Sequence, residues 1–151
     1  MSQYMLLVYE EEVDAAVQAE REKVTPTLLE LHASLREAGL LVGVKRLRSA
    51  ESATSIRARD GQAEIVDGPF AVTKEVLAGY YILECADLDE ALKQAARLPM
   101  AAWGTVEVRP VVSADEWVEV VRQAGVDSAR RRAGPVCPNG PACRDVVMRA
   151  A

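Results

Sequence analysis

The chain has 151 residues, of which 50% are hydrophobic and 27% are charged, a composition typical of one soluble globular domain. Its formal net charge of -5 argues against a general nucleic-acid-binding surface. Residues 1–16, MSQYMLLVYEEEVDAA, hold no basic segment and only a short apolar run. We therefore expect neither a signal peptide nor a membrane span, and a cytoplasmic protein with reduced thiols.

The first part of the chain predicts a strand, a helix and a second strand. Residues 4–10, YMLLVYE, are apolar and aromatic, which predicts a buried strand. The acidic, alanine-rich residues 11–24 indicate a weak helix at best. A firmer helix begins with Thr25 as N-cap, has a proline in its first turn and ends at Gly39. Residues 40–47, LLVGVKRL, predict the second strand.

The middle of the chain predicts a hairpin, a sharp turn and a further strand. An Asp-Gly pair divides residues 54–68 into two short runs, which is a typical hairpin signal. The DGPF segment, residues 67–70, follows and holds the single phenylalanine of the chain. Residues 79–85, GYYILEC, then predict a strong strand, in which Cys85 is expected to be a small buried apolar residue.

Two capping boxes predict the remaining helices. The first begins at Asp87, and its helix is expected to bury an apolar face made of Leu88, Leu92, Ala95 and Ala96. Residues 105–112, TVEVRPVV, alternate and predict the last strand, and Pro110 places its end at an edge of the sheet or beyond the ladder. The second capping box begins at Ser113 and predicts a helix that reaches Gly125.

Residues 126–151 are rich in proline, glycine and arginine and predict a tail, which leaves residues 1–125 as one domain. The tail carries Cys137 and Cys143. Two inert thiols are expected there, although an oxidised loop or half of a metal site in a dimer stays open.

The order β-α-β, hairpin, β-α-β predicts an α+β fold of the ferredoxin-like type, followed by a C-terminal helix and tail. Such a subunit has an antiparallel four-stranded sheet with both helices on one face. The strand at 79–85 is apolar on both faces, which leaves one apolar face without cover. The sequence therefore suggests a homodimer that pairs sheet against sheet.

Four segments in this order carry a family resemblance: YMLLVYE, LREAGLLVG, VDGPFAVTKEVLAGYYILEC and GTVEVRPVV. Over residues 3–112 the chain resembles the DGPF-motif branch of the YCII-related proteins. This resemblance implies a ferredoxin-like subunit that pairs into a dimeric α+β barrel. Many DGPF proteins look like companions of extracytoplasmic-function sigma factors, so the resemblance also implies a regulatory role as an alternative to an enzyme.

Asp67 is the candidate acid/base residue. Gly68 and Pro69 make a sharp turn, which either holds the Asp67 carboxylate on nearby backbone amides or directs it into a pocket with Phe70 as an apolar wall. A carboxylate in such a pocket could act as a general acid or base. The acid of the family motif matches Asp67.

His32 is the single histidine and a weaker catalytic candidate. The resemblance places the histidine of YCII-type members early in the first helix, where this chain has Leu28, so the histidine–aspartate pair does not carry over. His32 is either an ordinary helix histidine or a displaced partner of Asp67. Because the chain has a single histidine, we expect neither a zinc or iron centre nor a haem site.

Two cations complete the candidate ligand-binding set of Gly68, Pro69, Phe70, Lys74 and Arg109. Lys74 could hold an anionic group, although a solvated pair with a neighbouring acid is the simpler interpretation. Arg109 could bind a carboxylate substrate or pair with Asp67, but a structural ion pair with Glu107 is favoured.

The sequence holds no P-loop, dinucleotide-binding, nucleophile-elbow or HExxH motif, so no metal and no cofactor is expected. Two hypotheses remain. The first is a protein that binds a small molecule, with cofactor-independent acid/base catalysis through Asp67 as its further step. The second is a non-enzymatic partner of a sigma factor. No direct contact with nucleic acid or membrane is expected in either case.

Overall fold

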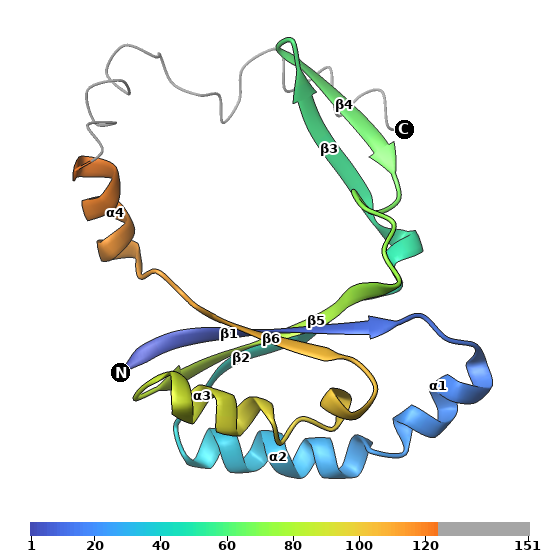
Figure 1. The fold of residues 1–151 in the computed structure, drawn as a ribbon, viewed down its shortest axis with the longest axis vertical. Coiled ribbons are helices and arrows are strands. Elements are labelled where there is room, and N and C mark those ends of the chain that lie inside the picture. The colour runs from blue at the N-terminus through green and yellow to red at the C-terminus, as the bar shows by residue number, and fades with distance from the viewer. Residues whose placement is uncertain (124–151) are drawn as a thin grey trace. The chain divides into compact units, whose positions relative to one another are not determined.

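The computed structural model describes residues 1–123, which divide into two units (Figure 1). The first unit, residues 1–55 and 65–111, contains the main sheet and three helices. The second unit takes in residues 56–64 and the described residues from 112 onward. The predicted tail, with Cys137 and Cys143, lies outside the described residues.

The main sheet is antiparallel, with the strand order β2-β5-β1-β6. Its strands are β1 (Ser2–Glu11), β2 (Leu41–Arg46), β5 (Glu75–Cys85) and β6 (Thr105–Pro110). This order confirms the predicted ferredoxin-like fold. Among the described strands β6 pairs with β1 alone, so Pro110 ends an edge strand, a position in which proline is tolerated.

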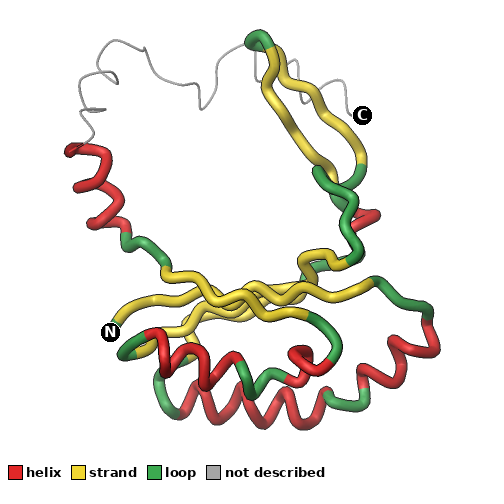
Figure 2. Tube along the Cα trace, in the orientation of Figure 1, coloured by secondary structure: helices red, strands yellow, loops and turns green. Residues whose placement is uncertain are grey.

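The helices of the first unit lie on one face of this sheet (Figure 1 and Figure 2). They are α1 (Ala15–Glu22), α2 (Thr25–Glu37) and α3 (Leu88–Ala95). Helix α2 buries Leu31 and Leu35. The apolar face predicted for α3 was partly wrong: Ala95 is buried as predicted, but Leu88, Leu92 and Ala96 are exposed, and Ala91 is the other buried residue. Alanine lets the helix backbone approach the sheet more closely than leucine would.

The core lies between this helix layer and the sheet. Alternate side chains of β1 and β5 point into it, since successive strand residues face opposite sides. The buried apolar residues are Tyr4, Leu6, Val8, Leu31, Leu35, Tyr81, Leu83, Cys85, Ala91, Ala95, Leu98 and Met100. Cys85 is fully buried, as expected, and burial raises the pKa of its thiol.

The capping residues predicted at the helix ends were mostly correct. Asp87 accepts a hydrogen bond from the Glu90 amide, and Ser113 and Glu116 form their reciprocal box at the start of α4 (Ala114–Gln123). Thr25 was wrong as an N-cap. It is already helical, and its hydroxyl donates to the Glu22 carbonyl oxygen at the end of α1.

Helix α1 is better formed than the sequence indicated. Asp14 is its N-cap, and the carboxylate accepts a hydrogen bond from the Val17 amide at 2.9 Å. The hairpin is as predicted, with β3 (Thr54–Arg59) paired to β4 (Gln62–Asp67). Its turn residues Asp60 and Gly61 both have positive φ, at 50° and 76°, as a tight hairpin turn requires.

No helix of the first unit covers the second face of the main sheet. Met5, Leu7, Tyr80 and Ile82 lie on it and are half-buried. This is the face that the predicted homodimer would use. The dimer itself stays a prediction.

Candidate functional site

Three hollows meet at one end of the main sheet. Here β1 and β2 end and β5 begins, because β5 runs antiparallel to both neighbours. The β1–β5 register shifts between Val8 and Tyr9, which marks a bulge. Bulges bend and twist a strand and are frequent beside functional sites.

The first, polar hollow has a volume of about 480 Å³. Four glutamates and two arginines line it, together with other polar and apolar residues: Glu10, Glu11, Glu12, Glu51, Arg46, Arg48, Gln18, Ser49, Val13, Leu47, Val76, Leu77 and Ala78. Among the described residues, Glu10 is the only buried charged side chain, with 6% of the residue exposed. An Arg46 guanidinium nitrogen lies 3.8 Å from its carboxylate.

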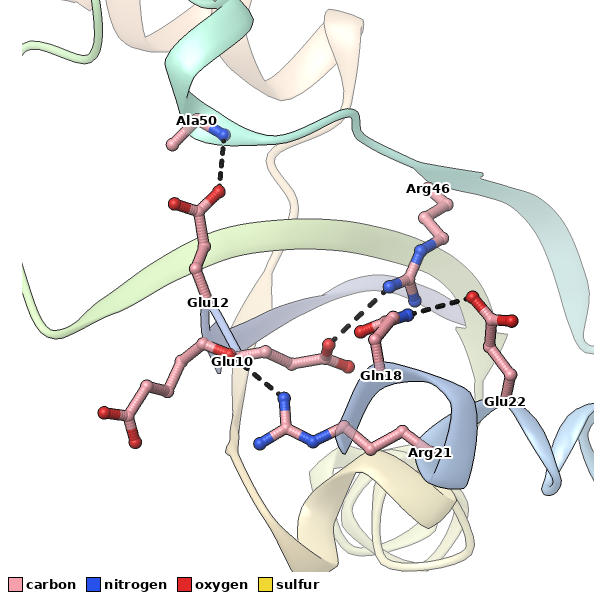
Figure 3. A network of polar contacts seen from close by, with 8 residues as sticks. Glu10, Glu12, Gln18, Arg21, Glu22, Arg46 and Ala50 are labelled. Carbon is pink, nitrogen blue, oxygen red and sulfur yellow. Dashed lines mark hydrogen bonds and ion pairs between the residues drawn. The ribbon is translucent and has the colours of Figure 1, made fainter. Parts of the chain in front are cut away.

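Figure 3 shows how the surrounding polar groups are engaged. Glu12 accepts hydrogen bonds from the Ser49 hydroxyl and the Ala50 amide, which lower the pKa of its carboxyl. These bonds fasten the end of β1 to the 3₁₀ turn η1 (Ala50–Ser52). Arg21 of α1 donates to the Glu11 carbonyl oxygen at 3.0 Å. The rim of the polar hollow is therefore tied together by α1, β1 and η1.

The second, apolar hollow has a volume of about 530 Å³. Its lining is mostly apolar: Tyr9, Leu47, Ala50, Ala53, Pro69, Phe70, Ala71, Val76 and Leu77, with Arg48, Ser49, Ser52, Ser55, Thr73 and Glu75. It shares Leu47, Arg48, Ser49, Val76 and Leu77 with the polar hollow, so the two adjoin. The DGPF segment thus contributes Pro69 and Phe70 to one wall.

The backbone holds the DGPF turn in place. Gly68 has φ of 101°, a conformation that side chains other than glycine rarely adopt. Its amide donates to the Ala53 carbonyl oxygen at 2.7 Å, and its carbonyl oxygen accepts from the Ser55 hydroxyl at 2.8 Å. The turn is therefore fixed by its neighbours across the hairpin base.

Asp67 is the last residue of β4 and is exposed. It does not line either of these hollows, and within residues 1–123 its carboxylate forms no hydrogen bond. The capped turn weighed from the sequence is not formed, since the residue two positions on is Pro69, which has no N–H. The acid/base role of Asp67 stays a prediction.

A third, small hollow of about 90 Å³ lies beside His32 and Tyr81, and Glu10 and Arg46 line it as well. The Tyr81 hydroxyl lies 3.0 Å from His32 Nε2. Burial raises the pKa of Tyr81 to about 12, and burial together with the Arg36 charge lowers the pKa of His32. The two side chains are within hydrogen-bond distance, and which of them donates depends on the tautomer of His32. The structure places His32 beside Tyr81 and in a different hollow from Pro69 and Phe70.

The two predicted cations form surface ion pairs. Arg109 lies 3.4 Å from Glu107, which confirms the structural pair favoured from the sequence. Lys74 lies 3.9 Å from Glu11, the neighbour of Glu10. Both pairs are well exposed, and exposed pairs contribute little to stability.

Sequence reasoning missed Glu10, although a signal for it existed. Tyr4, Leu6 and Val8 alternate toward the core, and Glu10 continues that series with a carboxylate. A buried charge at an apolar position is informative because its burial is costly unless something compensates it.

Neither a cluster of metal ligands nor a helix able to cross a membrane occurs within residues 1–123. No group of three or more histidine, cysteine, aspartate or glutamate residues lies together there as a metal site would require. In the same range, every helix falls short of the length and apolar content needed to cross a membrane.

Comparison with known proteins agrees with the fold. The family model of the YCII-related domain matches residues 2–117. An uncharacterized protein of Rhizobium meliloti (strain 1021) is 40% identical over 112 residues, which cover 72% of this chain and 90% of that protein. The finer assignment to the DGPF branch and the sigma-factor partner stay predictions. The fold, the family match and this relative together show that the chain belongs to the YCII-related family.

Proposed function

We propose that this protein binds a small organic molecule in the adjoining polar and apolar hollows. The observation that carries the proposal is the DGPF turn, which places Pro69 and Phe70 along an apolar hollow of about 530 Å³. Volumes of roughly 300–1,000 Å³ are usual for small-molecule sites. In this position the Phe70 ring of the DGPF segment would contact the bound molecule.

The chemistry of the lining supports the same function. Small-molecule sites combine a mainly apolar wall with a few polar groups that orient the ligand. Here the apolar hollow supplies the wall, and the adjoining hollow supplies Glu10 and Arg46. Phe70 is 80% exposed, so a ligand packed against its ring would remove apolar surface from water.

Catalysis is the finer part of the proposal. Asp67 is exposed and lies two residues before Pro69, which lines the apolar hollow, so it is the carboxylate we assign to acid/base chemistry on a bound ligand. An exposed carboxylate can exchange protons with solvent and with such a ligand. Binding is nevertheless the role that the geometry supports best, because Asp67 lines neither hollow.

Ligand-observed NMR with a library of small amines, carboxylates and neutral aromatic compounds tests binding. We expect some compounds to bind the wild-type protein and Phe70→Ala to weaken them at least fivefold. Val72→Ala is the matched control, since Val72 belongs to the same loop, is exposed and does not line the hollow. The proposal is wrong if nothing binds, or if binding is unchanged by both Phe70→Ala and Leu47→Ala.

A further inference from the structure

We infer that the ligand carries a protonated amine and that Glu10 binds it. This inference rests on the proposed function, because it names the ligand class of the same site. It goes further in assigning a role to a residue that lies outside the DGPF segment, on the strand that precedes the first helix.

Glu10 has one charged partner, Arg46, and no hydrogen-bond donor among the described residues. Its side chain is more than nine-tenths buried, yet among residues 1–123 no group donates a hydrogen bond to it. The single compensating charge is Arg46 at 3.8 Å, beyond hydrogen-bond distance, and the Arg46 side chain is 62% exposed. Among the described residues, the Glu10 oxygens are not counted with the buried polar atoms that lack a partner, so they keep access to the hollow and can accept a hydrogen bond from a ligand.

The carboxylate is also accessible to a ligand. Glu10 lines both the polar hollow and the small hollow, which also share Arg46 and Ala78. Figure 3 shows the Glu10 carboxylate pointing toward Arg46 and Gln18, which themselves line the polar hollow. A donor placed in this hollow would therefore meet the carboxylate directly.

The neighbouring charges favour a cation over an anion. Glutamates outnumber arginines four to two in the lining, so an anionic group would be repelled by more charges than attract it. Glu12 is occupied by Ser49 and Ala50, and Glu11 lies close to Lys74. Glu10 is thus the buried acceptor that remains for an ammonium group.

The adjoining hollow defines the rest of the ligand. Leu47, Val76 and Leu77 line both large hollows, so one molecule can place its amine at Glu10 and its apolar body against Phe70. The ligand class is therefore a primary amine with a compact aromatic or aliphatic body.

Calorimetric titration with three probes of matched shape tests the inference. The probes are 2-phenylethylamine, 2-phenylethanol and 3-phenylpropionate, which present a cation, a neutral hydroxyl and an anion on similar bodies. We expect the amine to bind the wild-type protein tightest and Glu10→Gln to weaken it at least tenfold, because a charge-assisted hydrogen bond is lost. The affinity for 2-phenylethanol should change less than twofold.

Glu30→Gln is the matched control, since Glu30 is exposed on α2 and lines none of the three hollows. The inference is wrong if 3-phenylpropionate binds tighter than the amine, or if both glutamine variants weaken the amine equally. The comparison of probes on the wild-type protein needs no variant to fold. If other compounds bind in a Phe70-dependent way but amines do not, this inference fails while the proposed function stands.

Discussion

The middle and the end of one sheet face differ in what they bury. In the middle, Leu6 and Leu83 are fully buried beneath α2 and α3, which contribute buried residues of their own. At the end, the same alternation of β1 brings Glu10 inward, and the neighbouring α1 has no buried residue. Strand β1 thus contributes to the packed core over most of its length, whereas its last inward-facing residue, Glu10, lines the polar hollow.

This contrast indicates a division between stability and binding. A packed apolar core stabilises the fold, whereas a buried carboxylate beside a hollow does not. Residues that are poorly suited to their surroundings in the free protein are frequently residues that bind ligands. The contrast can be tested by exchanging side chains in each region and measuring the free energy of unfolding.

The largest effect is expected in the middle of the sheet. Leu83→Ala should lower the free energy of unfolding by about 3 kcal/mol, because it removes buried methyl groups and leaves a cavity. Urea denaturation followed by circular dichroism measures it. Leu29→Ala, on the exposed side of α2, is the control and should change the value by less than about 0.5 kcal/mol. Equal losses for the two variants would show that the middle is not the stabilising core.

A smaller effect of opposite sign is expected at the end of the sheet. Glu10→Leu should raise the free energy of unfolding by about 1 kcal/mol, since leucine continues the apolar series and the exposed Arg46 stays solvated. The same variant should lose amine binding. Urea denaturation and the calorimetric titration check the two parts. A loss of stability of more than about 1 kcal/mol would mean that Glu10 has a structural role instead.

Much of the fold could be predicted because its signals are local. The box at Asp87 and Glu90 and the one at Ser113 each need only four neighbouring residues. The Asp-Gly turn is equally local. Predictions that needed packing distances were weaker, as α3 shows, because the sequence does not reveal how closely a helix approaches the sheet.

The site was harder to predict, for two physical reasons. In β1, Met5 and Leu7 are as apolar as Leu6 and Val8, so the sequence alone does not show which set faces the helices. The alternation shows that Glu10 lies in step with Leu6 and Val8, but it does not show that this set faces the core, and a charge at a strand end is expected to be exposed. The hollows also form only where β1, β2, η1 and the DGPF turn meet, and these segments are far apart in the sequence. The motif suggested Phe70 as an apolar wall, and Pro69 and Phe70 do line the apolar hollow, while their role in binding stays a prediction.

The smallest effect is expected at the boundary of the two regions, where His32 contacts Tyr81. Burial, with the Arg36 charge, lowers the pKa of His32 in the folded protein, so the unfolded chain takes up the proton first. The contribution of the neutral, hydrogen-bonded His32 is therefore complete above the unfolded pKa of about 6.5 and is lost as the pH falls below it.

Urea denaturation at pH 7.5 and pH 5.0 should accordingly show a larger loss of stability on acidification for the wild-type protein than for His32→Gln. At pH 7.5, Tyr81→Phe should cost about 1 kcal/mol, because it removes the hydroxyl that forms a hydrogen bond with His32 Nε2 and leaves that nitrogen without its partner. An identical dependence on pH in the wild-type protein and His32→Gln would place His32 in a solvent-like environment. The helix-covered core would then end before this residue, and the polar hollows would extend further beneath α2 than their lining residues indicate.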